Sequence, residues 1–299
     1  MKEDFTEWEP RPDDALRVEQ CDGIIDEYQQ MGLMLTLRQL YYQLVSRDII
    51  PNSERSYKNL GTLVSKARMA GMLDWDAIED RGRQPRKHAE FDDIEELIEA
   101  ALHAYRLPRW KGQENYVELW VEKEALAGVL QPMSDQYHVT LMVNKGYSSQ
   151  SAMYESARRI TRNSSEAANV VILYLGDHDP SGEDMVRDVA NRLKTFTRDE
   201  YEIEVVKLAL TMAQVNQYNP PPNPTKISDS RAEAYIKKFG HECWEVDALD
   251  PRTMQRLIAK TIEGYIDMDL MDEIKEREEF DKEALRDAAK RIKDTKETD

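Results

Sequence analysis

Hydrophobic residues in this chain occur either in short continuous runs or at helical spacing. The clearest run, residues 170–175, holds five aliphatic residues and one tyrosine and stops at the turn Gly-Asp-His-Asp-Pro-Ser-Gly. Such a run predicts a strand that is buried on both faces. Segments at residues 116–121, 139–143 and 203–208, whose apolar residues are interrupted by polar ones, predict three further strands. Between them, apolar residues recur every three or four positions, which predicts helices. This alternation predicts an α/β fold with a mainly parallel sheet and right-handed crossovers.

The N-terminal part has a different pattern, with helical spacing only. Three short helices are predicted, at residues 13–31, 36–45 and 53–71. The outer face of the third helix carries four basic residues, Arg55, Lys58, Lys66 and Arg68. Three short helices of which the last is basic are typical of a helix-turn-helix or winged-helix module that binds DNA. The pattern fits equally well a small helical bundle with a solvated basic face.

Connections and minor elements account for the remaining residues. Residues 81–88 form a basic connection, and the proline-rich residues 220–224 predict an extended segment. The charged tail from residue 270 predicts a helix with little to bury. Further predicted elements are helices at residues 92–105, 231–239 and 250–267 and a short strand at residues 243–246.

Composition narrows the class of protein. The chain has 299 residues, 40% of them hydrophobic and 33% charged, which suits one large or two ordinary soluble domains. No apolar run approaches the roughly 20 residues of a membrane-spanning helix, and the acidic N-terminus lacks the apolar core of a signal peptide. The two cysteines, Cys21 and Cys243, have no metal-ligand spacing. We therefore expect a cytoplasmic protein without a membrane association.

Charge is distributed unevenly along the chain. The net charge is −17, which argues against a surface that binds nucleic acid everywhere. Residues 31–73, however, carry a net charge of +4, whereas residues 1–30 carry −7 and residues 263–299 carry −6. A local basic module in an acidic protein remains compatible with DNA binding that is sensitive to salt.

Three carboxylates are expected to meet at one edge of the predicted sheet. Asp177 and Asp179 follow the strand at residues 170–175, and Glu122 follows the strand at residues 116–121. Because ligands of open α/β sheets bind beyond the carboxyl ends of the strands, these side chains form a candidate site. Clustered carboxylates repel one another unless a cation compensates, and hard oxygen ligands suit Mg²⁺. The alternative is a strand that ends in an acidic turn.

Several motifs in this order resemble one family. Glu122 and the segment Asp177-His178-Asp179-Pro180-Ser181-Gly182 resemble a Toprim domain, a Rossmann-like domain that binds metal. More narrowly, the chain is similar to the A subunit of topoisomerase VI and to the related meiotic double-strand-break transesterase. The other motifs that carry this resemblance are Asn144-Lys145-Gly146-Tyr147, Trp244-Glu245-Val246-Asp247-Ala248-Leu249-Asp250-Pro251 and Thr36-Leu37-Arg38-Gln39-Leu40-Tyr41-Tyr42.

The resemblance implies a domain plan and a reaction. Residues 1–90 would form a winged-helix domain, residues 91–112 a connecting helix and linker, residues 113–265 the Toprim domain, and residues 266–299 a charged helical tail. Tyr42 would attack a DNA phosphodiester and give a 5′-phosphotyrosyl intermediate, with Arg38 beside the same phosphate. The residues implied as Mg²⁺ ligands are Glu122, Asp177 and Asp179, and Lys145 is a candidate phosphate contact.

The resemblance also implies partners and leaves alternatives. In this family the tyrosine of one protomer meets the metal site of the other, which implies a homodimer. The chain contains no Gly-rich nucleotide motif, so ATP-driven strand passage would need a separate ATPase subunit. The chain is also shorter than a typical A subunit, which implies a shortened stand-alone relative. One alternative is a hydrolytic Toprim nuclease in which Tyr42 is structural, and another is a non-cleaving DNA-binding subunit.

Overall fold

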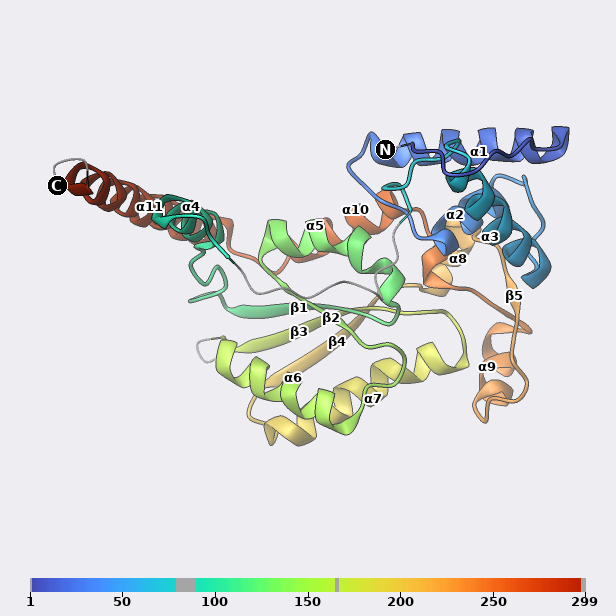
Figure 1. Cartoon of the computed structure of the whole chain (residues 1–299). Helices are drawn as coiled ribbons and strands as arrows, with labels where there is room; N and C mark the ends of the chain where they lie inside the picture. Colours follow the sequence, from blue (N-terminus) through green and yellow to red (C-terminus); the bar gives the residue numbers. More distant parts are fainter. Residues whose placement is uncertain (1, 79–89, 165–166, 297–299) are drawn as a thin grey trace.

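A four-stranded parallel sheet forms the centre of the protein, as a computed structural model of the chain shows (Figure 1). The structure describes residues 2–78, 90–164 and 167–296, so the predicted connection at residues 81–88 lies outside the described residues. The strands lie in the order β2-β1-β3-β4. Their bounds are Asn115–Val121 (β1), Thr140–Val143 (β2), Asn169–Leu175 (β3) and Glu202–Ala209 (β4). The predicted α/β class and parallel sheet are confirmed.

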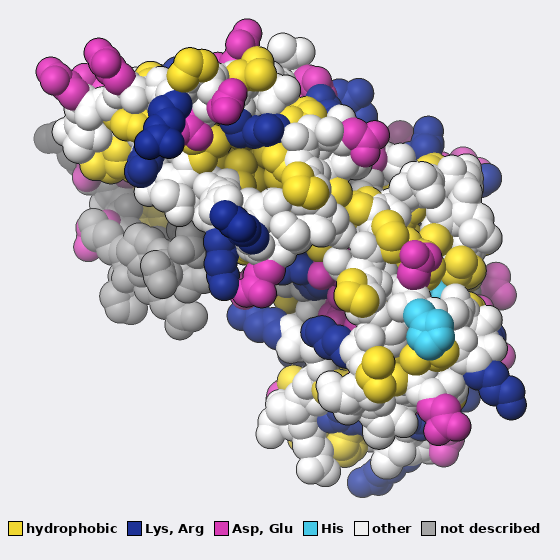
Figure 2. All heavy atoms as spheres, turned by 90° about the vertical axis from the view of Figure 1, so that its right-hand side faces the viewer, with side chains coloured by type: hydrophobic (Ala, Val, Ile, Leu, Met, Phe, Trp, Pro, Cys, Tyr) yellow, Lys and Arg dark blue, Asp and Glu magenta, His cyan; other side chains and the backbone are white. Residues whose placement is uncertain are grey.

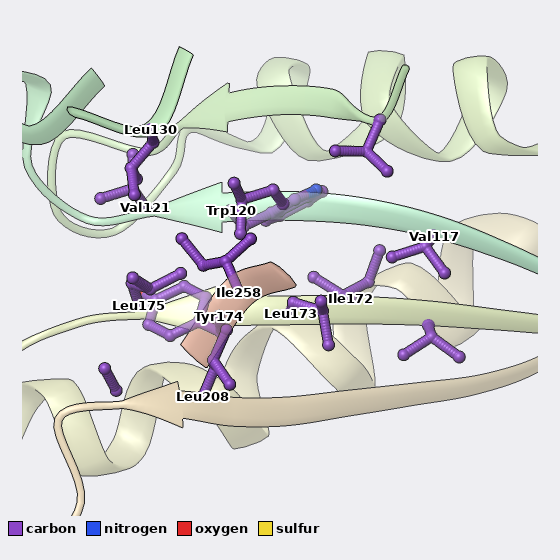
Figure 3. Close-up of a cluster of buried hydrophobic side chains, with 14 of the residues drawn as sticks. Val117, Trp120, Val121, Leu130, Ile172, Leu173, Tyr174, Leu175, Leu208 and Ile258 are labelled. Carbon is purple, nitrogen blue, oxygen red and sulfur yellow. The ribbon is translucent and has the colours of Figure 1, made fainter. Parts of the chain in front are cut away.

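Helices cover both faces of this sheet. Figure 1 shows helices on both sides of the sheet, and those that share a side are in mutual contact. One pair is α5 (Ala127–Tyr137) with α10 (Pro251–Ile262), and the other is α6 (Gln150–Asn163) with α7 (Pro180–Thr197). The side chains of the two central strands are almost completely buried, which explains why their sequences are mainly apolar. Trp120 and Tyr174 are the largest of them, and Figure 3 shows both within the core.

Three helices form the N-terminal unit, which has a hydrophobic cluster of its own. They are α1 (Pro12–Gln29), α2 (Leu37–Ser46) and α3 (Glu54–Met69). Thr36 begins α2 with a capping box that involves Gln39, because the Thr36 side chain accepts from the Gln39 N–H. Within residues 1–90, the part that the structure describes contains isolated β-bridges. It contains no β-strand of two or more residues. The winged-helix prediction is therefore not confirmed, although the three helices are present.

The segment after β4 returns to the N-terminal unit. It contains an unpredicted helix, and its predicted strand at residues 243–246 is only a two-residue strand followed by a 3-10 turn. Its elements are α8 (Met212–Tyr218), β5 (Asn223–Pro224), α9 (Ala232–Phe239), β6 (Glu242–Cys243) and η2 (Val246–Ala248). Because η2 contacts α2 and Ala248 joins the N-terminal hydrophobic cluster, this segment attaches the N-terminal unit to the sheet.

Two helices lie side by side away from the sheet (Figure 1). They are α4 (Ile94–Ala104) and α11 (Met268–Lys296). The charged tail is helical as predicted, but it buries more than its sequence suggested. Met271 and Glu278 are almost inaccessible to solvent, and Lys282 is buried against Glu278. Among the described residues, no helix combines the length and the apolar character needed to span a bilayer.

Candidate functional site at the carboxyl edge of the sheet

Glu122 and Asp177 meet where β1 and β3 end. The Glu122 N–H donates to the Leu175 carbonyl oxygen at 2.9 Å, which continues the parallel ladder by one residue. The Asp177 N–H then donates to Glu122 Oε2 at 3.1 Å. The expected convergence of these two acidic residues is therefore observed, and it follows directly from the neighbouring positions of the two strands.

A close backbone approach fixes the acidic turn. A Cβ atom on Gly182 would lie 2.2 Å from the Asp177 carbonyl oxygen, so a residue with a side chain cannot occupy this position without a shift. Asp179 begins α7, where its Oδ1 accepts from the Gly182 N–H at 2.6 Å and from Ser181 Oγ at 2.9 Å. The Pro-Ser-Gly sequence after Asp179 thus starts a helix and holds the turn against the strand end.

Lys123 lies at the centre of the carboxylates, and sequence reasoning missed it. Its Nζ lies 2.9 Å from Asp177 Oδ1, 2.8 Å from Glu245 Oε2 and 2.9 Å from Asp247 Oδ1. Burial disfavours the charged form, but Asp247, Asp177 and Glu245 outweigh burial and raise the pKa of Lys123. Glu245 and Asp247 belong to the Trp-Glu-Val-Asp motif, which was the one signal that could have identified this cluster.

Negative charge still exceeds positive charge around Asp177. Burial, together with Glu122 and Asp247, raises the pKa of Asp177 to about 7 despite the opposing effect of Lys123. The pKa of Glu122 is also raised, first by burial and then by Asp179. A carboxylate cluster with raised pKa values is a site where a cation would stabilise the ionised forms.

The free oxygen atoms of this cluster suit Mg²⁺. Glu122 Oε1, Asp177 Oδ2 and Asp179 Oδ2 make no hydrogen bond to the part of the chain that the structure describes. Within the same residues, no three His, Cys, Asp or Glu side chains are arranged as a complete metal site. These donors therefore fit a Mg²⁺ ion that keeps several waters and shares the phosphate oxygens of a substrate, and they do not form a closed cage.

Arg38 and Tyr42 lie one turn apart on α2, as expected. Arg38 Nη2 is 3.5 Å from Tyr42 Oη, and the guanidinium carbon is 5.7 Å from the centre of the ring. Arg38 also forms ion pairs with Glu245 and, through Nε at 3.1 Å, with Asp247. Burial raises the pKa of Tyr42, and Asp247 and Glu245 raise it further, so the phenol is protonated at neutral pH.

Tyr41, the neighbouring aromatic residue, has a structural role. Its Oη accepts from the Ser53 N–H at 2.8 Å and donates to Asn52 Oδ1 at 2.8 Å. These bonds attach α2 to the start of α3. Tyr41 therefore provides a matched control for any test of Tyr42.

A cleft of about 790 Å³ joins the two halves of the candidate site. Its walls include Arg38 and Tyr42 from the N-terminal unit and Asp177 and Asp179 from the edge of the sheet. Figure 2 shows a hollow between the upper and lower parts of this face, with Lys and Arg side chains gathered around it. A single chain thus brings the tyrosine and the acidic turn to one surface.

The predicted DNA-contacting residues lie at different places. Arg55, Lys58 and Lys66 are exposed on α3, where Lys58 pairs with Glu54 at 2.7 Å. Arg68 is half-buried, unlike the other three basic residues. Its guanidinium lies 4.5 Å from the ring centre of Trp75 and donates to the Trp75 carbonyl oxygen, because the chain folds back after α3.

Lys145 lies near the carboxylates. It pairs with Glu124 at 2.9 Å and lines a smaller cleft of about 560 Å³ together with Glu122, Lys123 and Asp177. Its position at the rim of the acidic cluster suits a contact with a substrate phosphate.

His178, between Asp177 and Asp179, is a buried residue of the turn. It is 2% exposed, and its Nδ1 lies 2.7 Å from Tyr235 Oη. The backbone N–H of His178 donates to the Trp244 carbonyl oxygen at 2.8 Å. The backbone N–H of Trp244 donates to the His178 carbonyl oxygen at 3.0 Å. This pairing holds the segment that carries Glu245 and Asp247 beside the acidic turn, which gives His178 a positioning role.

No protein-family profile matches the chain, and no curated protein sequence is significantly similar to it.

Proposed function

We propose that the chain is a Mg²⁺-dependent DNA-cleaving enzyme in which Tyr42 attacks the phosphodiester, as in the A subunit of topoisomerase VI. The observation that carries this proposal is the shared cleft, whose walls contain Tyr42 and Arg38 on one side and Asp177 and Asp179 on the other. A nucleophile, a guanidinium and hard oxygen donors for Mg²⁺ are the groups that phosphodiester transfer requires. The proposed winged-helix character of residues 1–90 would bring the duplex to this cleft.

Each residue has a defined task in this proposal. Glu122, Asp177 and Asp179 would hold Mg²⁺, which stabilises the negative charge that develops on the phosphate. Arg38 would exchange its contact with Glu245 for the phosphate beside Tyr42, since a guanidinium binds two phosphate oxygens at once. Withdrawing Arg38 from Glu245 leaves that carboxylate with Lys123. Lys145 would contact the flanking backbone of the DNA.

A plasmid assay tests the proposal. Supercoiled plasmid is incubated with Mg²⁺ and with the wild type, Tyr42→Phe, Tyr41→Phe or Asp177→Asn. We expect cleavage by the wild type and Tyr41→Phe, none by the other two variants, and protein bound covalently to 5′ ends. Removal of Mg²⁺ by EDTA should abolish cleavage in every sample. Cleavage that survives in Tyr42→Phe would contradict the tyrosine mechanism.

A second candidate is a hydrolytic nuclease with the same metal site. The observation in its favour is the environment of Tyr42, which is 3% exposed and has its pKa raised by burial and by Asp247 and Glu245. A protonated, buried phenol is a poor nucleophile. In that case Tyr42→Phe still cleaves without a covalent adduct, whereas Asp177→Asn does not. A wild type that binds DNA at low salt and cleaves nothing would instead indicate a DNA-binding subunit.

The proposed homodimer and a separate ATPase subunit need their own tests. Because Tyr42 and Asp177 line one cleft of a single chain, we favour a site formed within one protomer. Mixed Tyr42→Phe and Asp177→Asn proteins should then remain inactive. If the tyrosine instead serves the partner protomer, random mixing of a twofold-symmetric dimer would restore about a quarter of the wild-type activity. Strand passage with ATP would require an added ATPase.

A further inference from the structure

A second pocket, which the proposed function does not use, lies at the opposite end of the sheet. It has a volume of about 460 Å³ and is formed where β1 and β2 begin and α6 ends. Among its lining residues are Arg109, Lys111, His138 and Arg162. Of the described residues that line it, none is an Asp or a Glu. In a chain with a net charge of −17, a pocket lined by basic and not by acidic groups is a distinct chemical environment.

Arg109 is the central group of this pocket. It is 7% exposed, and its Nη2 pairs with Glu278 Oε2 at 2.8 Å. Its Nε and Nη1 are buried and have no hydrogen-bond partner among the described residues. A buried donor without a partner costs about 1–3 kcal/mol, and more when it is charged, so a group that accepts these N–H bonds would stabilise the protein.

Glu278 does not neutralise this region by itself. The same carboxylate pairs with Lys282 at 2.8 Å and accepts from the Leu107 N–H at 2.9 Å. Arg106 Nε also approaches it to 3.9 Å. Lys282 has a second partner in Glu279, at 2.8 Å. Two carboxylates are therefore shared by three cationic side chains, which leaves positive charge near Arg109 for a ligand.

The other walls supply a second guanidinium and neutral polar groups. Arg162, on the last turn of α6, is exposed and forms no ion pair with a described residue. Burial, followed by the charge of Arg109, lowers the pKa of His138, so the imidazole is neutral at pH 7. Asn163 donates to Tyr116 Oη at 3.3 Å at the back of the pocket. Two arginines beside neutral polar side chains match the oxygen atoms of a dianion.

We propose that this pocket is a binding site for a small phosphate-bearing ligand of about the size of a mononucleotide. A phosphate dianion matches the two guanidinium groups, whereas a single carboxylate would leave one of them uncompensated. The volume of about 460 Å³ lies within the range of small-molecule pockets and exceeds that of a bare phosphate. The seven residues of β1 separate the pocket from the acidic cleft by roughly 20 Å, so the two sites are independent.

Calorimetric titration in a phosphate-free buffer tests this proposal, with inorganic phosphate and a nucleoside monophosphate as probes. Arg162→Ala and Arg109→Lys should each weaken binding at least about tenfold, which corresponds to the loss of a charged hydrogen bond. Arg109→Lys keeps a cation beside Glu278, so we expect this variant to fold. Thermal unfolding of the variant checks that expectation. Arg158→Ala is the matched control, because Arg158 is also exposed on α6 but pairs with Glu155 and does not line the pocket.

The outcomes separate the sources of the phosphate group. Tighter binding of the nucleoside monophosphate than of inorganic phosphate assigns the site to a nucleotide, and equal affinities assign it to phosphate itself. The proposal fails if the wild type binds neither probe at millimolar concentration. It also fails if both arginine variants bind as well as the wild type, since the ligand would then lie elsewhere.

Discussion

The two ends of the same parallel sheet hold buried ionic clusters of opposite balance. At the carboxyl end, one cation, Lys123, lies between the carboxylates of Asp177, Glu245 and Asp247. At the amino end, one carboxylate, Glu278, lies between Arg109 and Lys282. In each cluster one counter-ion is shared by several like charges, and a second one, Arg38 at the carboxyl end and Glu279 at the amino end, contacts only some of them. The uncompensated charge is therefore negative at one end and positive at the other.

This difference explains what each end can bind. A surplus of carboxylates attracts a divalent cation, and the raised pKa values of Asp177 and Glu122 reflect that surplus. A surplus of guanidinium groups attracts an oxyanion, and the unpartnered nitrogens of Arg109 reflect it. The protein core between the clusters is mostly apolar, and the buried Glu118 within it is already paired with Arg159, so neither cluster can neutralise the other.

Removing the shared cation of the acidic cluster should have the largest effect. Lys123→Met leaves Asp177, Glu245 and Asp247 without their common partner, and breaking a buried ion pair by removing one member costs about 3–5 kcal/mol. We expect the free energy of unfolding, measured with urea at pH 7, to fall by about that amount. Lys145→Met is the control, because Lys145 is 64% exposed and its pair with Glu124 contributes at most about 1 kcal/mol. Equal effects of the two substitutions would show that Lys123 is not the shared counter-ion.

The backbone that holds the acidic turn offers a second way to disturb only one end. Gly182→Ala would place a Cβ atom 2.2 Å from the Asp177 carbonyl oxygen, which forces the turn to shift. We expect a loss of about 1–3 kcal/mol in urea unfolding, as for other overpacked sites. Gly23→Ala in α1 is the matched control, since no atom of the described residues lies within 4 Å of the new Cβ atom. That variant should be about 0.5–1 kcal/mol more stable, because alanine favours a helix.

The sequence predicted the carboxyl end better than the amino end, for a physical reason. Glu122 and Asp177 each follow a long apolar strand, and parallel strands bring such residues together without any further information. Lys123 was missed because its partners, Glu245 and Asp247, lie more than 100 residues away in a short irregular segment. The spacing of apolar residues along the chain gives no information about contacts between segments so far apart in the sequence. The Trp-Glu-Val-Asp motif marked the segment but not its contacts.

Other misses have the same origin. Arg109 and Glu278 are 169 positions apart. Neither is part of a periodic apolar pattern from which its position in the fold could be predicted. The burial of His178 has no signal in the local sequence, because it depends on its pairing with Trp244 and its contact with Tyr235, which is 57 positions away. Helical spacing predicts that Arg68 lies on an outer face. In the structure its guanidinium packs over the ring of Trp75, which lies beyond the end of the helix. Spacing within one element predicts faces, and it does not predict which distant segment covers them.

The smallest effect is expected at the shared carboxylate of the amino end, and it depends on pH. Burial opposes the ionisation of Glu278, but Lys282, the Leu107 N–H and Arg109 outweigh it and lower the pKa from its usual value of 4.5. Because the pKa of Glu278 is lower in the folded protein than in the unfolded chain, the ionised carboxylate stabilises the fold above about pH 4.5. This stabilisation is lost as the pH falls through the pKa that Glu278 has in the folded protein. Glu278→Gln should therefore reduce the free energy of unfolding by about 1–2 kcal/mol at pH 7, because glutamine keeps one acceptor but not the charge.

This difference between Glu278→Gln and the wild type should shrink as the pH is lowered below 4.5. Urea unfolding of both proteins at several pH values measures it. A control is Glu279→Gln, since Glu279 pairs with the same Lys282 but its side chain is 59% exposed, and its removal should change stability by less than about 1 kcal/mol. If the difference in the free energy of unfolding between the wild type and Glu278→Gln stays constant with pH, the charge of the Glu278 carboxylate does not contribute to stability.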